Sequence, residues 1–220
     1  MDQTHQRSVW LARDHHLDRL LTVKRLAGSD RELRSVALLS DIDAASLARV
    51  YGVHQDQEVH WLLSEFIDGV ALASGDMLWP AQAVLPLLVD LTGALIAMAD
   101  AGVVHCDISP GNVLIDVNGR VRLVDFGIAA RMGEAVSGAG TPGFAAPEVV
   151  AAQCCTSAAD LWSLAAMGCW LLTLEAPYWV TTDDGQYVLI LPAWRPADQA
   201  ARSLWSALQR ALILDPASRP

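Results

Sequence analysis

The chain of 220 residues has almost no lysine, since 14 of its 15 basic residues are arginine and only Lys24 is lysine. A sequence with this bias would seldom use lysine for solubility alone, so the neighbourhood of Lys24 must decide whether it has a specific role. Charged residues are also scarce, at 18% against about 25% in ordinary globular proteins. Hydrophobic residues make up 53%, which excludes a disordered chain and allows one domain, or two lobes that share a core.

Basic residues are fewer than acidic ones, 15 against 25, and the formal net charge is -10. A protein that coats nucleic acid or an anionic membrane would carry the opposite sign, so we expect no nucleic acid polymer as a partner. A locally basic site could still bind phosphates. The net charge therefore leaves a nucleotide ligand possible.

Three further features are missing. The four cysteines include no C-x-x-C pair, the spacing of a zinc knuckle or a redox motif, and we expect buried free thiols in a reducing, cytoplasmic compartment. The first ten residues carry charge and lack an apolar core, so no signal peptide is visible. The most apolar stretch, 161–174, is shorter than the roughly 18–20 residues that span a bilayer, which predicts a buried helix and no membrane span.

The hydrophobic pattern changes along the chain. Before a seam at Asp68 and Gly69 it predicts two strands within 8–26 joined by a turn at 15–18, a helix over 30–40, and strands at 47–53 and 59–66 with Gly52 at the turn. After the seam it predicts helices over 84–102, 158–174 and 198–213, a hairpin of strands at 113–117 and 121–125, and a loop over 131–148. Strands first and helices later indicate an α+β fold.

Two carboxylates and one amide come from adjoining loops of the second part. Asp107 and Asn112 lie in the segment HCDISPGN between a helix and a strand, and Asp125 begins the segment DFG at the end of the predicted hairpin. Phosphoryl transfer needs this combination, because one carboxylate accepts the proton of the attacking hydroxyl while another carboxylate and an amide oxygen hold Mg2+. The alternative is that both aspartates only cap loops.

These segments resemble the eukaryotic-type (Hanks-type) Ser/Thr protein kinases, whose catalytic loop reads H-R-D-x-x-x-x-N and whose metal loop reads D-F-G. Five further segments resemble family motifs in the family's order: 22–24 (A-x-K), 63–67 (hinge), 140–148 (GT-x-x-[YF]-x-APE), 160–164 (D-x-W-S-x) and 215–220 (late Arg motif). The resemblance covers nearly the whole chain. It implies a two-lobed protein-kinase-like fold, with a small strand-rich N-lobe at 1–67 and a larger helical C-lobe at 68–220.

The resemblance assigns catalytic roles to matching residues. Asp107 would be the catalytic base, Asn112 and Asp125 would bind Mg2+, and Lys24 would hold the α- and β-phosphates of ATP. Glu32 would orient Lys24 from the following helix. It lies only eight residues after Lys24, nearer than the family usually allows, so a solvated helix glutamate remains the alternative.

The same resemblance places the adenine ring. The Glu65 carbonyl and the Ile67 backbone would contact its edge, and Val9, Thr22 and Leu114 would sandwich its faces. The last three are also ordinary residues of apolar faces, so their assignment depends on the alignment alone.

Four other residues have structural or specificity roles by resemblance. His105 would support the metal loop through Phe126. Glu148 and Arg219 would form a buried ion pair, and Thr141 favours the Ser/Thr branch of the family.

The sequence departs from the family at the phosphate loop and at the catalytic loop. The three positions of the family's glycine-rich loop hold Asp2, Thr4 and Arg7, and no glycine precedes Gly28. The arginine of H-R-D is Cys106, so the usual anchor for a phosphorylated activation loop is absent. The family's first strand and last helix also have no counterpart.

The predicted function is ATP- and Mg2+-dependent phosphorylation of serine or threonine on a protein substrate. One alternative is a pseudokinase that binds nucleotide or protein without turnover. A second is a small-molecule kinase of the aminoglycoside or choline type, which the segment HCDISPGN slightly favours and the APE-like segment opposes. Alanine richness with little lysine favours a bacterial source.

Overall fold

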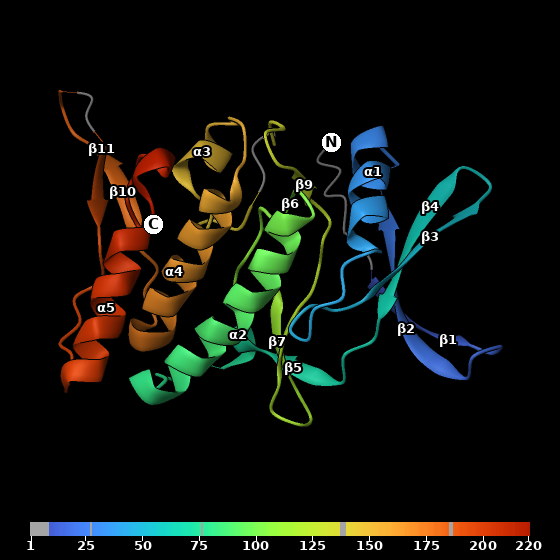
Figure 1. Cartoon of the computed structure of the whole chain (residues 1–220), viewed down its shortest axis with the longest axis horizontal. Coiled ribbons are helices and arrows are strands. Elements are labelled where there is room, and N and C mark those ends of the chain that lie inside the picture. Colours follow the sequence, from blue (N-terminus) through green and yellow to red (C-terminus); the bar gives the residue numbers. More distant parts are fainter. Residues whose placement is uncertain (1–8, 27, 76, 137–139, 185–186) are drawn as a thin grey trace, which may run out of the picture.

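The computed structural model describes residues 9–26, 28–75, 77–136, 140–184 and 187–220. It has a strand-rich part at one end and a helical part at the other (Figure 1). This arrangement confirms the predicted α+β class. The boundary proposed between 67 and 68 falls between β4 (Val59–Glu65) and β5 (Gly69–Ala71).

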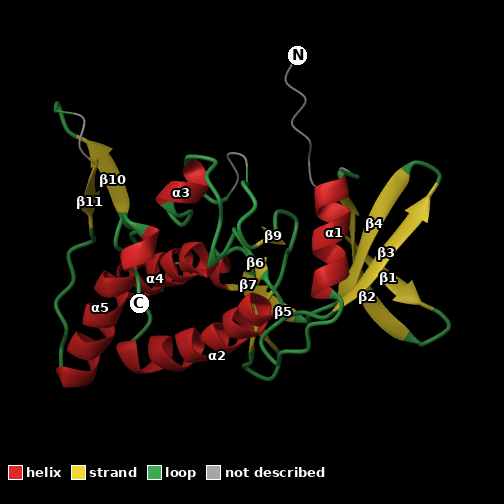
Figure 2. Cartoon of the chain, turned by 45° about the horizontal axis from the view of Figure 1, so that its top comes forward, coloured by secondary structure: helices red, strands yellow, loops and turns green. Residues whose placement is uncertain are grey.

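One antiparallel sheet forms the strand-rich part, in the order β1-β2-β4-β3. Besides β4 it contains β1 (Val9–Asp14), β2 (Arg19–Leu26) and β3 (Val50–Asp56). Helix α1 (Asp30–Leu39) lies beside the sheet and packs on β3 (Figure 2). The predicted turn at 15–18 is present, because the Asp14 carboxylate accepts the amide protons of His16 (3.0 Å) and Leu17 (3.2 Å).

The prediction that Gly52 forms the turn between β3 and β4 is wrong. Gly52 lies inside β3, where the register shifts between Val50 and Gly52, and its φ is +132°. The turn comes at Gln57 and Glu58, with Gln57 at φ +54°. A bulge and a turn both favour glycine for its positive φ, so the residue type alone did not separate them.

The helical part contains three long helices and several short strands. The helices are α2 (Ala81–Asp100), α4 (Ser157–Thr173) and α5 (Gln199–Ala211), close to their predicted ranges. The predicted hairpin is β7 (Val113–Asp116) with β8 (Val121–Leu123), and β5 joins it as a third strand. The remaining short elements are β6 (Val103–Val104), β9 (Ala130–Arg131), α3 (Pro147–Val150), η1 (Leu72–Ser74) and η2 (Pro216–Ser218).

Two features of this part depart from the expectations. The predicted loop over 131–148 begins in β9 and ends in α3. A hairpin of β10 (Tyr178–Thr181) and β11 (Tyr187–Ile190) was not predicted.

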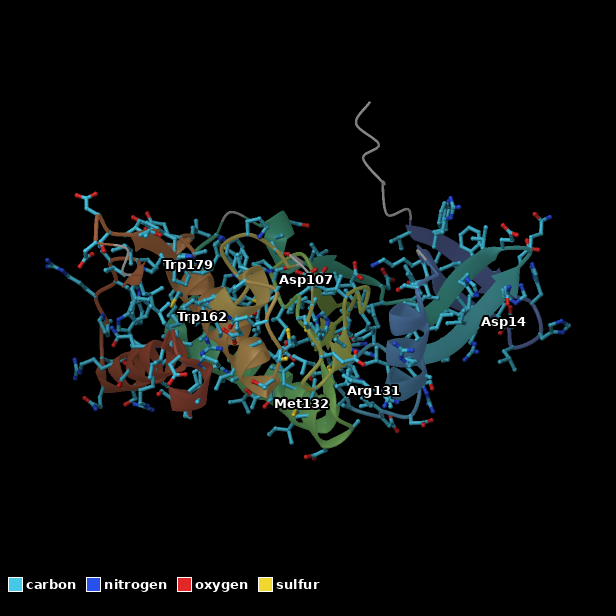
Figure 3. The ribbon with its side chains drawn as sticks, turned by 90° about the horizontal axis from the view of Figure 1, so that it is seen from above. Asp14, Asp107, Arg131, Met132, Trp162 and Trp179 are labelled. Carbon is cyan, nitrogen blue, oxygen red and sulfur yellow. The ribbon has the colours of Figure 1, made fainter. Side chains whose placement is uncertain are left out.

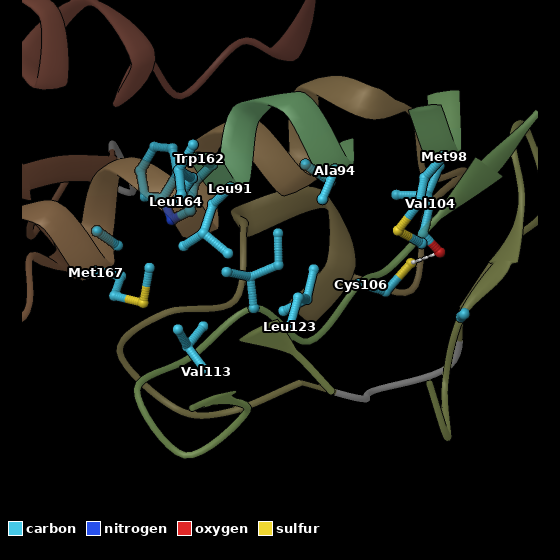
Figure 4. Close-up of a cluster of buried hydrophobic side chains, with 14 of the residues drawn as sticks. Leu91, Ala94, Met98, Val104, Cys106, Val113, Leu123, Trp162, Leu164 and Met167 are labelled. Carbon is cyan, nitrogen blue, oxygen red and sulfur yellow. Dashed lines mark hydrogen bonds between the residues drawn. The ribbon is translucent and has the colours of Figure 1, made fainter. Parts of the chain in front are cut away.

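Helix α4 is the centre of the core. Its apolar residues are buried on nearly every side of the helix, as expected for a helix without a polar face. Trp162 is fully buried. Helices α2 and α5 both pack on it. Figure 4 shows Leu91 of α2 beside Trp162 and Leu164 of α4. At Gly168 a Cβ would lie 2.8 Å from Leu208 Cδ2 and 3.1 Å from Leu88 Cδ1, so this glycine allows the close approach of all three helices.

Helix α2 is the one described helix that is long and apolar enough to cross a membrane. Its buried residues Val84, Leu87, Leu91 and Met98 lie in the core cluster, and the helix packs against α4 and α5. Packing within the protein buries 33% of the apolar segment, and the rest is exposed or partly exposed.

All four cysteines are free thiols. Cys106, Cys155 and Cys169 are buried as predicted, whereas Cys154 is exposed. The expectation of buried thiols is therefore wrong at Cys154, which lies in an exposed stretch before α4.

Candidate active site

The loop that carries Asp107 is held by a buried aspartate of the central helix. The Asp160 carboxylate accepts the backbone amide protons of His105 (2.7 Å) and Cys106 (2.9 Å). Burial raises the pKa of Asp160, and the two amides together with the nearby His105 act in the opposite direction. Helix α4 thus fixes the start of the catalytic loop to the core.

The two residues before Asp107 set its direction. Cys106 has a φ of +66°, which is unusual for a residue with a side chain and is typical of functional sites held by their surroundings. The His105 ring contacts Phe126 edge to face, with 5.4 Å between centroids, as predicted. The Asp107 amide also donates to His105 Nδ1 (3.3 Å).

Asp107 lies between the strand-rich part and the helices (Figure 3). Its Oδ1 accepts from the Thr141 amide (2.8 Å) and hydroxyl (2.7 Å), and its Oδ2 accepts from Asn112 Nδ2 (3.0 Å). Asn112 Nδ2 also donates to the Asp107 carbonyl (2.7 Å). The structure therefore brings Asp107, Asn112 and Thr141 together with both carboxylate oxygens oriented.

Lys24 reaches the same region from the strand-rich part. Its side chain forms an ion pair with Asp125, and the residue is 5% exposed. The Asp125 carboxylate also accepts from the Gly127 amide (3.1 Å). Burial acts to raise the pKa of Asp125, but the charge and hydrogen bond of Lys24 outweigh it and the pKa is lowered.

The pairing of Lys24 with Asp125 was not predicted, because Glu32 was expected to be its partner. Glu32 lies in α1, and its side chain is outside the described part of the structure. The assignment of Glu32 therefore stays a prediction.

The segment expected to contact adenine is fixed by an ion pair. Glu65 Oε2 pairs with Arg122 of β8 and accepts the Arg49 amide proton (3.0 Å). The Glu65 carbonyl lies 3.4 Å from the Thr22 hydroxyl, and Ile67 is buried. Sequence reasoning missed Arg122.

The residues expected to sandwich adenine come from two sheets. Val9 lies opposite Lys24 in the register of β1 and β2, and Thr22 lies two residues earlier on β2, so all three share one sheet face. Leu114 lies on β7, opposite Ala71. Val9 is 55% exposed and Leu114 is half-buried, and their joint contact with a base stays a prediction.

The candidate metal ligands offer one carboxylate and one amide. Among the described residues no group of three or more His, Cys, Asp or Glu side chains could hold a metal ion by itself. Asn112 uses its nitrogen to bind Asp107, which leaves its oxygen as the atom for a cation. This oxygen donor set fits Mg2+, which usually takes one or two protein ligands together with substrate phosphates.

The glycine-loop positions Asp2, Thr4 and Arg7 lie outside the described residues. Their effect on phosphate binding stays a prediction.

The predicted pair of Glu148 and Arg219 is confirmed. The guanidinium binds both carboxylate oxygens, at 2.5 Å and 2.8 Å, and the two side chains are 3% and 0% exposed. Arg219 also donates to the carbonyls of Ala158 (2.8 Å) and Ile213 (2.8 Å). The pair ties α3 to the chain after α5.

Sequence reasoning identified Asp160 only as part of a motif and missed its bonds to the catalytic loop. An aspartate in the first turn of an otherwise apolar helix was the available signal, because a buried carboxylate needs donors.

Comparison with known proteins agrees with this geometry. A family model described as protein kinase domain matches residues 8–220. The Arabidopsis thaliana serine/threonine-protein kinase RUNKEL is 28% identical over 204 residues, 86% of this chain and 15% of the relative. Serine/threonine-protein kinase PknK of Mycobacterium bovis is 38% identical over 151 residues, 62% of this chain and 13% of the relative. Serine/threonine-protein kinase PrkC of Bacillus subtilis is 26% identical over 188 residues, 78% of this chain and 29% of the relative.

The chain spans less than a third of the length of each of these relatives. Since the family model matches almost all of this chain, and the loops of Asp107 and Asp125 meet as that family's motifs require, the chain belongs to the protein kinase family, as a Hanks-type serine/threonine kinase domain.

Proposed function

We propose that this domain transfers the γ-phosphoryl group of ATP, with Mg2+, to a serine or threonine hydroxyl of a protein substrate in the cytoplasm. The observation that carries the proposal is the double hydrogen bond from Thr141 to Asp107 Oδ1, with Asn112 on Oδ2. It orients one carboxylate at the centre of the site, where a general base is needed.

Asp107 is the group that we propose to accept the proton. As the substrate oxygen forms its bond to the γ-phosphorus, its O–H proton passes to the Asp107 carboxylate and ADP leaves with the electrons of the broken P–O bond. The hydrogen bonds to Thr141 and Asn112 hold the carboxylate at a fixed angle, so little reorganisation is needed during the step.

We assign nucleotide binding to Lys24 and metal binding to Asp125 and Asn112. Mg2+ would neutralise charge on the phosphates. Lys24 and Asp125 form an ion pair with each other. With nucleotide and Mg2+ bound, the Lys24 ammonium would hold a phosphate oxygen and the Asp125 carboxylate would hold the cation. The pair thus neutralises a buried ammonium and a partly buried carboxylate in the absence of nucleotide.

Adenine would lie beside the Glu65 carbonyl and the Ile67 backbone, with Val9, Thr22 and Leu114 against its faces. The ion pair between Glu65 and Arg122 supports this assignment because it fixes the segment that carries the two backbone contacts.

The test is transfer of labelled phosphate from ATP with Mg2+ to generic protein acceptors. Asp107→Asn should lower the rate by about 100-fold or more, the usual contribution of a general base. Asp100→Asn is the matched control, because Asp100 is an exposed carboxylate at the end of α2. Transfer that survives Asp107→Asn unchanged would refute the assigned base.

A second measurement separates the kinase from its alternatives. ATP should raise the melting temperature only when Mg2+ is present. At a hundredfold excess over the dissociation constant, the gain in free energy of unfolding should be about 2.7 kcal/mol. Stabilisation by ATP without any transfer would instead identify a pseudokinase. Phosphate that appears on an aminoglycoside or choline and never on protein would identify a small-molecule kinase.

A further inference from the structure

Arg122 of β8 joins three segments that are distant in the sequence. Its Nη2 forms an ion pair with the Glu65 carboxylate at the end of β4. The same nitrogen donates to the Leu47 carbonyl (3.2 Å) in the linker between α1 and β3, residues 40–49. Glu65 and Leu47 precede Arg122 by 57 and 75 positions, so both contacts are a product of the fold.

The backbone of this linker is bonded on both sides. On one side, the Ala48 amide donates to the Leu123 carbonyl (2.9 Å), and the Leu123 amide donates to the Ser46 carbonyl (2.7 Å). On the other side, the Glu65 amide donates to the Arg49 carbonyl (2.8 Å). The linker thus connects β8 of the helical part to β4 of the strand-rich part, and the ion pair described above joins the same two strands directly.

Arg122 also lies on the sheet face where we expect adenine. Leu114 of β7, assigned to one face of the ring, is directly opposite Arg122 in the register of β7 and β8. Side chains that lie directly opposite one another project from the same face of a sheet. The Glu65 carbonyl is assigned to the edge of the ring, and Arg122 pairs with the carboxylate of that same residue. One side chain therefore connects the strand under the ring to the strand at its edge.

Stability alone is a weak reason for a charge at this position. The Arg122 and Glu65 side chains are 13% and 30% exposed, so both charges lose much of their hydration. The Arg122 Nε is buried and has no hydrogen-bond partner among the described residues. A buried pair often contributes little net stability, and a buried donor without a partner adds a cost. A role in positioning accounts for the arrangement better.

We propose that Arg122 is a positioning residue for the nucleotide base, which acts through Glu65 and makes adenine affinity depend on the contact between β8 and β4. With Arg122 present, the Glu65 carbonyl is held at a fixed distance from Leu114, and the base enters a site that is already formed. Without Arg122, binding of the nucleotide must itself order the segment after β4, which lowers the affinity. This role rests on the proposed function, because that function makes adenine the ligand.

The transfer step should depend little on Arg122. Asp107 is held by Thr141 and Asn112, and its loop is held by Asp160. In the described part of the chain, the side chain of Arg122 bonds to β4 and to the linker and to none of these four residues. Arg122→Gln should therefore raise KM for ATP and leave kcat within about twofold.

Dissociation constants of ATP with Mg2+ test the assignment on the intact chain. Titration calorimetry of Arg122→Gln should show binding weaker by about tenfold, the order expected when one charge-assisted contact is lost. Glu65→Gln should show a similar loss, and it tests the same pair if Arg122→Gln does not fold. The double variant should bind no more weakly than either single variant, because the two residues act as one unit. Arg120→Gln is the matched control and should bind as the wild type does, because Arg120 is exposed just before β8.

The conservative variant Arg122→Lys supplies a second readout. A lysine ammonium can still pair with Glu65, so this variant should recover at least part of the ATP affinity that Arg122→Gln loses. A loss caused only by altered packing around β8 would not follow the charge in this way.

Four results would overturn the assignment while leaving the proposed function intact. They are equal ATP affinity in the wild type and Arg122→Gln, losses that add in the double variant, no recovery in Arg122→Lys, and a fall in kcat as large as the rise in KM. The last result would show that the whole site had loosened, and not the base site alone. A wild type that binds no ATP would instead refute the proposed function and this role with it, whereas one that binds ATP without transfer leaves the dissociation constants to decide.

Discussion

At the scale of single residues, the carboxylates of the site each accept more than one hydrogen bond. Asp107 is bound by Thr141 and Asn112, and Asp160 by two consecutive backbone amides. Charge-assisted bonds of this kind are stronger than neutral ones and fix the orientation of the carboxylate. The reacting residue therefore owes its position to groups that do not react.

Asp125 predicts a dependence of stability on pH. Its folded pKa lies below the ordinary pKa of an aspartate, because Lys24 outweighs burial. The stabilisation by the pair is therefore fully present above pH 3.8 and is lost as pH falls through the lower, folded pKa. Urea unfolding from about pH 7 to pH 2.5 should give a higher free energy of unfolding for the wild type than for Asp125→Asn. This difference should shrink only at the acid end of the range.

Asp100→Asn is the control for that experiment and should follow the wild type throughout, since Asp100 is exposed. A constant gap between the wild type and Asp125→Asn down to the lowest pH would show that Asp125 does not titrate with the pair.

The sequence was informative about residues that occur in ordered motifs. Asp107, Asn112 and Asp125 could be predicted because their spacing along the chain is itself the signal. The ion pairs of Lys24 with Asp125 and of Glu65 with Arg122 could not, because each joins the four-stranded sheet to a residue in or just after β8, which belongs to another sheet. Periodicity reports which face a residue occupies and carries no information on the partner across a cleft.

At the scale of elements, the packing of three helices depends on one missing side chain. Gly168 of α4 leaves no room for a Cβ beside Leu208 and Leu88, whereas Gly93 of α2 has no atom within 4 Å of that position. Gly168→Val should cost about 1–3 kcal/mol of unfolding free energy through overpacking. Gly93→Val, the same change in an open helix position, should be near neutral, and denaturation of the two variants side by side checks this.

Equal stability of the two variants would show that Leu208 and Leu88 move aside at no cost. The helices would then not be held at their present separation by Gly168.

Elements with a strong burial pattern were predictable, and those without one were not. Helices α2, α4 and α5 bury one face or nearly the whole surface, which gives the spacing from which they were predicted. The hairpin of β10 and β11 exposes Tyr178, Val180 and Val188, so no alternation of apolar and polar residues marks it. Gly52 was predicted to form a turn because it is a glycine. It instead lies inside β3, where its positive φ accompanies a shift in register.

At the scale of the whole molecule, one buried ion pair ties distant parts of the chain. Glu148 and Arg219 are 71 positions apart, and Arg219 also lies over the Trp162 ring at 5.0 Å. Arg219→Ala should cost about 3–5 kcal/mol, because it leaves a carboxylate in the core without its partner. Glu148→Gln should cost less, since the amide oxygen still accepts a hydrogen bond, and urea titration of both variants gives the comparison.

The decisive result is whether Arg219→Ala lowers the free energy of unfolding more than Glu148→Gln does. Variants that unfold together with the wild type would show that the segment after α5 contributes nothing to the core.

The burial of Lys24 has a practical consequence for the entire protein. In the folded state the lone lysine is 5% exposed, so a bulky amine-reactive dye finds no accessible lysine side chain. Once the chain opens, that side chain becomes an ordinary nucleophile in water. The extent of lysine acylation after a brief pulse therefore counts the fraction of molecules that have lost their fold, without any engineered label.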